Sequence, residues 1–144
     1  MTWKIIAAGK PALDYARIGI ADYLGRLRAH VKAEAVFVKP GPRLHERMLE
    51  HSEGHHRVLL DERGKLFASR SFADEIRKLQ NRSIPRCALL VGASDGWDDA
   101  IRAKADLLWS LGPQTLQHEL ALLVALEQIY RTESILAGAP YHRD

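Results

Sequence analysis

The sequence predicts an α/β fold in which helices cover both faces of one parallel sheet. Short apolar runs alternate with longer segments whose apolar residues recur at helical spacing, the pattern of repeated β-α units. Glycine and proline follow several of these runs, as at Gly9-Lys10-Pro11 and Pro40-Gly41-Pro42. A chain of 144 residues suits one domain, so we expect residues 1–144 to form a single unit.

Residues 4–8 are predicted to form the first strand, which Gly9 closes. Residues 12–29 carry apolar side chains on one stripe at helical spacing and therefore predict a helix. A second strand is expected over residues 33–39, followed by a polar helix over residues 43–53.

A third strand is expected over residues 57–60, and the turn-forming stretch 61–65 is expected to end it. Ser71, with Asp74 three residues later, is typical of a capping box. This pair predicts a helix that begins near Ser71 and runs to about residue 80.

Residues 87–91 are predicted to form the fourth strand, which ends in the loop 92–96. Asp98 and Asp99 suit the first turn of a helix, because carboxylates favour the positive end of the helix dipole. A short fifth strand is expected over residues 107–111.

The last predicted helix, over residues 117–136, is apolar around its whole circumference at residues 120–126. Such a helix must be covered on every side, and in a small chain a partner subunit is the expected cover. The sequence therefore predicts a homodimer.

Composition excludes several classes of protein. Apolar residues make up 47% and charged residues 27%, which excludes a disordered tail, a fibrous repeat and a disulfide-stapled miniprotein. The single cysteine, Cys87, lies in an apolar run and has no cysteine to pair with, which favours a reducing compartment and a buried thiol over a nucleophile. No apolar stretch approaches the ~20 residues of a membrane span, and no signal peptide is visible. We expect a cytoplasmic protein without membrane contact.

The net charge of +3 is unevenly placed, because residues 108–144 hold two basic and four acidic groups. A modest basic surface over the rest of the chain suits a polyanionic partner, but charge alone does not decide whether one is bound.

A ligand pocket is predicted where strands end. Open parallel sheets bind ligands beyond the carboxyl ends of their strands. Small or turn-forming residues follow Leu60 and occupy residues 92–96 and 112–116. The loop 92–96 resembles a nucleotide-cradling turn, although it is not Gly-x-Gly-x-x-Gly and a plain strand-to-helix turn explains it equally well.

Metal binding is the weaker alternative. His51 and His55 stand four residues apart, but no cysteine or carboxylate is placed as a third ligand, and Gly54 interrupts the helix. We therefore expect a solvated polar surface and no metal.

Two further groups are candidates for chemistry. His118 opens the last helix beside a predicted strand end, where it either faces a ligand or caps the helix. Tyr141, His142 and Arg143 combine an aromatic ring, an imidazole and a guanidinium, a set able to stack on a base and to handle protons and charge. A frayed polar terminus is the alternative reading of this tail.

Taken together, segments spread in order over the chain resemble the RlmH family, SPOUT-class methyltransferases that modify a pseudouridine of large-subunit ribosomal RNA. The matching segments are Ile5-Ile6-Ala7-Ala8-Gly9-Lys10, Tyr23-Leu24, Leu59-Leu60-Asp61-Glu62-Arg63-Gly64-Lys65, Leu89-Leu90-Val91-Gly92 with Asp95-Gly96, Leu108-Trp109-Ser110-Leu111, Thr115-Leu116-x-His118, Glu127-Gln128-x-Tyr130-Arg131 and Pro140-Tyr141-His142-Arg143.

The resemblance implies a SPOUT-type fold with a C-terminal trefoil knot, a homodimer, and S-adenosylmethionine as cofactor. It implies methylation of N3 of a pseudouridine in large-subunit ribosomal RNA, with either the free RNA or the assembled ribosome as substrate. The tail of one subunit is expected to complete the site of the other, with His142 or His118 handling a proton, Arg143 holding an anion and Tyr141 stacking or packing. The residues implied for cofactor binding are Leu60, Gly92, Ala93, Gly96, Leu111, Gly112, Pro113, Gln114, Thr115, Leu116 and Gln117.

Three positions depart from the family pattern. Ala93 stands where a second glycine is usual, Gln117 where proline is usual, and Leu122 where arginine is usual. These departures leave a second hypothesis, a non-catalytic knotted dimer that binds RNA or a nucleotide.

Overall fold

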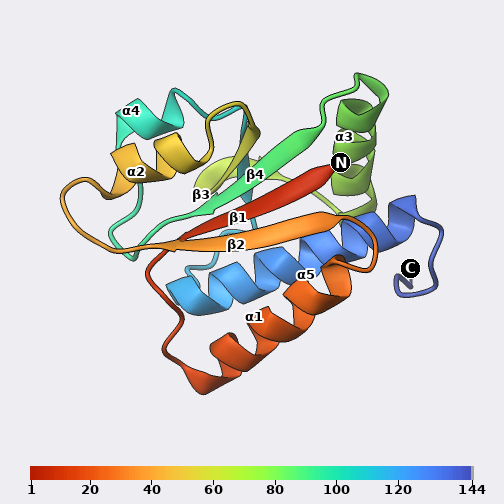
Figure 1. Ribbon diagram of the computed structural model, residues 1–144, viewed down its shortest axis with the longest axis horizontal. Coiled ribbons are helices and arrows are strands. Elements are labelled where there is room, and N and C mark those ends of the chain that lie inside the picture. The colour runs from red at the N-terminus through yellow and green to blue at the C-terminus, as the bar shows by residue number, and fades with distance from the viewer. Residues whose placement is uncertain (144) are drawn as a thin grey trace.

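The computed structural model describes residues 1–143, which form one sheet between two layers of helices (Figure 1). In this part of the chain the strands are β1 (Thr2–Ala8), β2 (Lys32–Val38), β3 (His56–Leu66), β4 (Arg86–Val91) and β5 (Leu107–Ser110). The helices are α1 (Asp14–Leu27), α2 (Leu44–His51), α3 (Ser69–Asn81), α4 (Asp99–Arg102) and α5 (His118–Leu136).

The sheet is parallel throughout, as predicted. Its strand order is β2-β1-β4-β3-β5, and each neighbouring pair runs in the same direction. All carboxyl ends therefore meet at one edge of the sheet, on the left in Figure 1. The central strand β4 is buried from Cys87 to Val91, which explains its continuous apolar sequence.

Helices cover both faces of the sheet, which confirms the predicted layers. Successive strand residues point to opposite faces, so Ile5 and Leu89 pack under α1, α3 and α5, while Ile6 and Leu90 pack under α2 and α4. Two apolar cores result, one on each side of the sheet.

Strand β3 does not end where the sequence predicted. The stretch 61–65 was expected to be a turn, but the strand continues through it as a bulge, and both Leu60 and Lys65 pair with Trp109 of β5. Gly64 permits this close approach of the two strands. A Cβ atom at Gly64 would lie 2.5 Å from the backbone carbonyl carbon of Leu108, closer than any side chain can approach.

The predicted capping box is wrong, whereas the acidic helix start is confirmed. Helix α3 begins at Ser69, with Ala68 as its N-cap, and the Ser71 hydroxyl donates a hydrogen bond back to the Ala68 carbonyl (2.9 Å). Asp98 caps α4, because its carboxylate accepts from the backbone N–H of Ile101 (2.9 Å).

Helix α5 is covered only in part by its own subunit. Leu122, Ala125, Leu126 and Ile129 are buried against the sheet, whereas residues 120, 121, 123 and 124 are only half-buried. Neighbouring α1 leaves Leu13, Tyr15 and Ile18 exposed. Within residues 1–143 no helix is both long enough and apolar enough to span a membrane.

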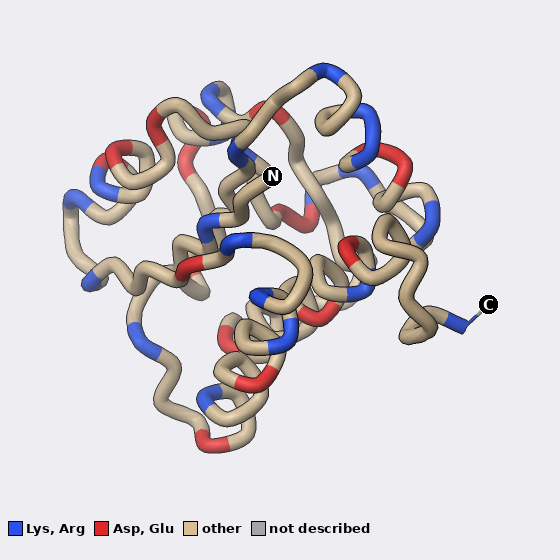
Figure 2. The backbone as a smooth tube through the Cα atoms, turned by 45° about the vertical axis from the view of Figure 1, so that its right-hand side comes forward, with Lys and Arg blue, Asp and Glu red and all other residues tan. Residues whose placement is uncertain are grey.

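Basic and acidic positions are interleaved along the backbone and often lie close together on the helices (Figure 2). Many form pairs one turn apart, such as Arg26 with Asp22 and Arg43 with Glu46. Such exposed pairs contribute little stability, but they neutralise the cations that they engage.

Candidate functional site

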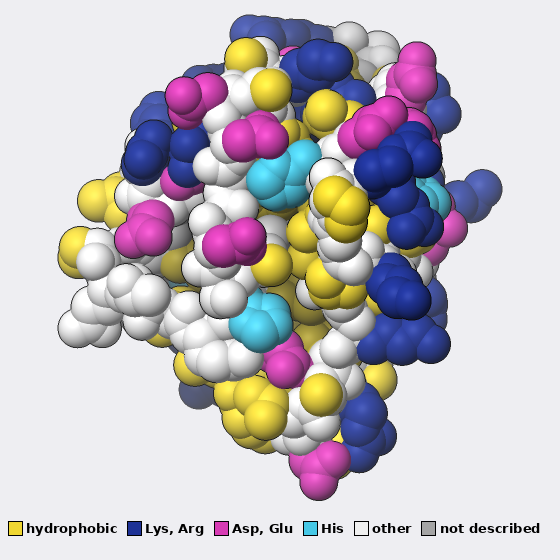
Figure 3. Space-filling model, turned by 90° about the vertical axis from the view of Figure 1, so that its left-hand side faces the viewer, with side chains coloured by type: hydrophobic (Ala, Val, Ile, Leu, Met, Phe, Trp, Pro, Cys, Tyr) yellow, Lys and Arg dark blue, Asp and Glu magenta, His cyan; other side chains and the backbone are white. Residues whose placement is uncertain are grey.

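A pocket of about 540 Å³ opens at the carboxyl-end edge of the sheet, as the sequence predicted. Figure 3 looks onto this edge. The pocket lies beside the bulge of β3 and the ends of β4 and β5, where α5 begins. Residues 60–63, 91–97, 111–112 and 114–116 line it together with Arg102, His118 and Ala121.

Most of the residues predicted to bind a cofactor line this pocket. They are Leu60, Gly92, Ala93, Gly96, Leu111, Gly112, Gln114, Thr115 and Leu116. Pro113 and Gln117 lie outside the lining. Gln117 instead begins α5, where its side-chain oxygen accepts from the N–H groups of Glu119 (2.9 Å) and Leu120 (3.0 Å).

Trp97 joins two of the pocket loops, a role that sequence reasoning missed. Its indole N–H donates to the carbonyl of Leu60 (2.7 Å), and its ring lies 3.1–3.2 Å from where a Cβ on Gly92 would be. On its other side the ring contacts His45 (centroids 5.1 Å apart). The bulge of β3 and the end of β4 are therefore held in fixed relation by one side chain. The sequence feature that could have pointed to this role is an aromatic residue directly after Gly96.

A buried ion pair forms one wall of the pocket. The Asp61 carboxylate is 6% exposed and accepts from Nε of Arg102 (2.7 Å) and from the backbone N–H of Arg63 (3.0 Å). The hydrogen bond to Asp61 raises the pKa of the Arg102 guanidinium, which is permanently charged in any case. This pair fixes the chain that follows Leu60. It was also missed, although an acidic residue directly after a strand is a usual signal.

Glu119 ties the loop after β1 to the start of α5. Its buried carboxylate accepts from the backbone N–H groups of Ala12 and Leu13 (3.1 Å for Leu13). A small hollow beside it is bounded by Gly9, Pro11 and His118. His118 lines this hollow and the main pocket, so the loop after β1 is a direct neighbour of the pocket.

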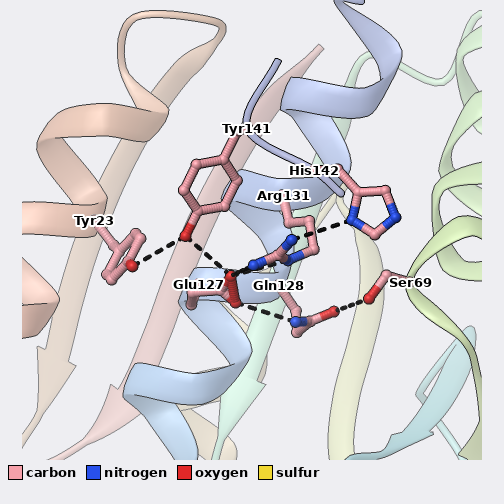
Figure 4. A network of polar contacts seen from close by, with 7 residues as sticks. All are labelled: Tyr23, Ser69, Glu127, Gln128, Arg131, Tyr141 and His142. Atoms are coloured by element: carbon pink, nitrogen blue, oxygen red, sulfur yellow. Dashed lines mark hydrogen bonds and ion pairs between the residues drawn. The ribbon is translucent and has the colours of Figure 1, made fainter. Parts of the chain in front are cut away.

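The C-terminal tail packs against the far part of α5 (Figure 4). The Tyr141 hydroxyl donates to Glu127 Oε1 (3.2 Å) and lies 3.0 Å from the hydroxyl of Tyr23. Arg131 donates to the same carboxylate oxygen (2.7 Å) and to Nδ1 of His142 (3.1 Å). The ion pair of Glu127 with Arg131, one turn apart on α5, is the centre of a network that holds the tail on the helix.

The network stabilises particular protonation states. Burial lowers the pKa of Arg131, but the hydrogen bond and charge of Glu127 outweigh this effect, so that the pKa is raised overall. Burial and the bonds to Tyr23 and Glu127 raise the pKa of the Tyr141 phenol, which stays protonated at neutral pH. Tyr141 is thus a fixed donor and packing group in this network.

The pocket and the tail lie at opposite ends of α5 (Figure 1). His118 and Arg131 are thirteen positions apart on this helix, which corresponds to about 20 Å at 1.5 Å per residue. One subunit therefore does not bring His118 together with His142 or with the exposed Arg143.

The candidate metal pair is not assembled. Helix α2 ends at His51, and His55 lies beyond it with Nδ1 3.0 Å from the Glu53 carbonyl. Among residues 1–143 no three histidine, cysteine or carboxylate side chains are grouped as metal ligands.

Comparison with known proteins gives a consistent result. The family described as "Predicted SPOUT methyltransferase" matches residues 1–142. A Thermus thermophilus protein named ribosomal RNA large subunit methyltransferase H is 46% identical over 143 residues, 99% of each chain. A Deinococcus radiodurans protein of the same name is 39% identical over 145 residues, again 99% of each chain.

Solved structures agree at the level of the fold. A probable methylase family protein from Haemophilus influenzae Rd KW20 superposes with a TM-score of 0.61 at 11% identity, over 99% of this chain and 70% of that one. A probable methyltransferase from Bordetella pertussis Tohama I gives 0.60 at 14% identity, over 92% and 95%. The resemblance seen in the sequence is confirmed: the chain belongs to the SPOUT methyltransferase family.

Proposed function

We propose that the protein transfers a methyl group from S-adenosylmethionine to N3 of a pseudouridine in large-subunit ribosomal RNA, acting on the assembled ribosome in the cytoplasm. One observation carries this proposal. The three loops that the family resemblance implies for the cofactor, after Leu60, at residues 92–96 and at residues 111–116, converge on one pocket. Relatives of nearly equal length are named for this class of reaction.

The pocket fits a cofactor of this size and chemistry. Its volume of about 540 Å³ lies within the ~300–1,000 Å³ typical of ligand sites. Gly112 presents backbone without a side chain, and a Cβ there would meet no atom within 4 Å, which lets its amide approach a ligand closely. Ala93 adds one methyl group to the lining. When bound, S-adenosylmethionine supplies an electrophilic methyl group on a sulfonium centre.

The protein must then position the base and remove one proton. N3 of pseudouridine is an imide nitrogen and becomes a good nucleophile only when deprotonated. A neutral His118 at the pocket, or a His142 brought to it, accepts this proton, and Arg143 stabilises the developing anion or holds a phosphate. Tyr141, hydrogen-bonded to Glu127 and Tyr23, serves mainly to hold the tail that carries His142 and Arg143.

In a homodimer, the pocket of one subunit can lie beside the tail of the other. Pocket and tail are about 20 Å apart along α5, so a tail can complete a pocket only in the other subunit. The exposed Leu13, Tyr15 and Ile18 of α1, beside the half-buried side of α5, offer an apolar surface for this pairing. A two-fold arrangement with antiparallel α5 helices places each tail beside the opposite pocket.

We also propose that the C-terminal segment is threaded as a trefoil knot. The family match supports this threading, because the resemblance of the sequence to SPOUT methyltransferases implies it. A crystal structure traced through residues 60–118 decides the point.

The function is tested by calorimetric titration of S-adenosylmethionine, followed by transfer of a radiolabelled methyl group to ribosomes that lack the modification. We expect micromolar binding at no more than one site per chain, and label in the large-subunit RNA. Cofactor binding without transfer to ribosomes or to free ribosomal RNA would contradict the proposal and favour a non-catalytic RNA-binding dimer.

A further inference from the structure

We propose that Lys10 and Lys39 form a phosphate-binding pair that holds the backbone of the RNA strand beside the pocket. The inference rests on the proposed function and adds a docking contact to it. Lys39 follows directly after β2, and Lys10 lies two residues beyond the end of β1, at the same edge of the sheet as the pocket.

The parallel register brings the two lysines close, because each follows by one residue a member of the hydrogen-bonded pair Gly9 and Val38. Ala8 pairs with Val38, and the N–H of Gly9 donates to the Val38 carbonyl (2.7 Å), so that the paired strands end together. Pro40 packs on Gly9, 3.5 Å from where a Cβ would lie. Neighbouring strands are about 4.8 Å apart, so the lysines present two positive charges within reach of successive phosphates on one strand.

The loop that carries Lys10 is fixed relative to the pocket. Glu119 in the first turn of α5 accepts from the amides of Ala12 and Leu13, which lie just beyond Lys10. His118 lines the main pocket and shares a small hollow with Gly9 and Pro11. A strand held at Lys10 therefore passes next to the place where the reacting base is expected.

Both lysines remain available to an anion. Their side chains are exposed, and within residues 1–143 neither takes part in an ion pair, whereas the nearby Arg17 and Arg43 are already engaged by Asp14 and Glu46. Figure 3 shows lysine and arginine side chains gathered in a column along one side of the pocket face.

The chain offers a matched control at the opposite edge of the sheet. Lys32 begins β2, and Lys104 shortly precedes β5, where the backbone of Asp106 bonds to Arg57. Both are exposed lysines without an ion pair in the described part of the chain. The double variants K10Q/K39Q and K32Q/K104Q therefore carry the same change of charge in different places.

The test measures binding to purified 70S ribosomes, by sedimentation, over a series of salt concentrations. K10Q/K39Q is expected to bind about tenfold more weakly near physiological salt and to lose about 1.5 from the slope of log K against log salt, whereas K32Q/K104Q keeps the wild-type slope. K10R/K39R is expected to restore the slope, because it restores the charge.

Equal losses in the two glutamine variants would overturn the proposal, because they would report net charge alone. Weaker binding with an unchanged slope, or no rescue by arginine, would overturn it as well, since the lysines would then act on the fold. Titration of S-adenosylmethionine and methyl transfer by the wild-type protein separate the two proposals. Their failure counts against the function, whereas a slope that does not respond to K10Q/K39Q counts against the lysine pair alone.

Discussion

Trp97 shows how a single side chain can set the geometry of a binding loop. Its indole N–H donates to the Leu60 carbonyl, and its ring packs against Gly92, so that the bulge of β3 and the end of β4 depend on one residue. Replacing Trp97 with phenylalanine keeps an aromatic ring on Gly92 but removes the donor. We expect W97F to weaken the binding of S-adenosylmethionine about threefold to tenfold, since a typical hydrogen bond contributes about 1 kcal/mol. Calorimetry measures this change.

The control for W97F is the variant W3F. Trp3 is buried on β1, far from the carboxyl-end edge, and belongs to the core under α1 and α5. W3F should bind the cofactor as the wild type does, whatever its effect on folding. If W97F also binds with unchanged affinity, the bond to Leu60 does not shape the pocket.

The buried carboxylate of Glu133 makes the stability of the protein depend on pH. Its carboxylate is 3% exposed on α5, and burial raises its pKa despite the neighbouring Trp3 and Gln80. The folded state therefore binds this proton more tightly than the unfolded chain does, so Glu133 makes the protein less stable as pH rises through the interval between its ordinary pKa of about 4.3 and the raised value.

The variant E133Q removes this titration. We expect E133Q to gain stability relative to the wild type as pH rises from about 4 towards neutrality, with the difference reaching a plateau above the raised pKa. Urea unfolding at a series of pH values measures the difference. Curves for the two proteins that run parallel from about pH 4 to pH 7 would show that the carboxylate is not desolvated.

At the scale of the elements, the close approach of β3 to its neighbour β5 depends on Gly64. A Cβ there would lie 2.5–2.6 Å from backbone atoms of Leu108 and Trp109, which belong to a strand in the sheet and cannot move aside cheaply. We expect G64A to destabilise the protein by about 3 kcal/mol, at the upper end of the usual cost of overpacking. Chemical denaturation measures this loss.

Gly25 supplies the matched substitution. It lies within α1, where an added methyl group would have no atom within 4 Å and the backbone has no positive φ. G25A should stabilise the protein by about 0.5–1 kcal/mol, because alanine favours the helix. A destabilised G25A, or a G64A as stable as the wild type, would contradict this account of the two sites.

Elements that depend on local pattern were predictable from the sequence, and those that depend on distant partners were not. The strands around residues 4–8 and 87–91 have apolar periodicity of their own and lie where expected. The continuation of β3 through residues 61–65 is polar and turn-like, and only its pairing with Trp109 of β5 makes it a strand. Ser71 and Asp74 fit a capping box, yet α3 starts one half-turn earlier at Ser69.

The functional site was likewise predictable only in part. Its position follows from a general property of parallel sheets, so the strand ends at Leu60 and Gly92 were enough to locate it. The bonds that shape it were not predictable, because the partners of Trp97 and Arg102 lie 37 and 41 residues away in the sequence. The capping of α5 by the Gln117 side chain was also not predicted, because it depends on where the helix begins.

For the whole molecule, the separation of pocket and tail leads to a test by mixing subunits. A tail variant, H142A, and a pocket variant, G92V, should each be inactive as homodimers. The side chain added in G92V would meet the Trp97 ring, since a Cβ at Gly92 lies 3.1 Å from it. Subunits unfolded and refolded together in equal amounts should recover about a quarter of the wild-type methyl transfer, because each mixed dimer contains one intact pocket facing one intact tail.

No recovery on mixing, although mixed dimers are present by mass spectrometry, would mean that each tail serves its own pocket or that the tail has no part in the reaction. A mixture of H142A with H142R, in which no intact tail exists, controls for nonspecific recovery.

The placement of α5 also has a consequence for how the protein is made. This helix follows all the strands in the sequence, yet it packs against the apolar sides of α1 and α3, and the tail after it contacts Tyr23 through Tyr141. During synthesis, the first helix therefore emerges with its apolar side uncovered, and it stays so until almost the entire chain has been translated. Contacts between the two ends of a chain close slowly, and uncovered apolar surface invites aggregation in the interval. A premature stop shortly before residue 118 would thus leave one face of the sheet only partly covered, which makes such fragments natural clients of chaperones and proteases.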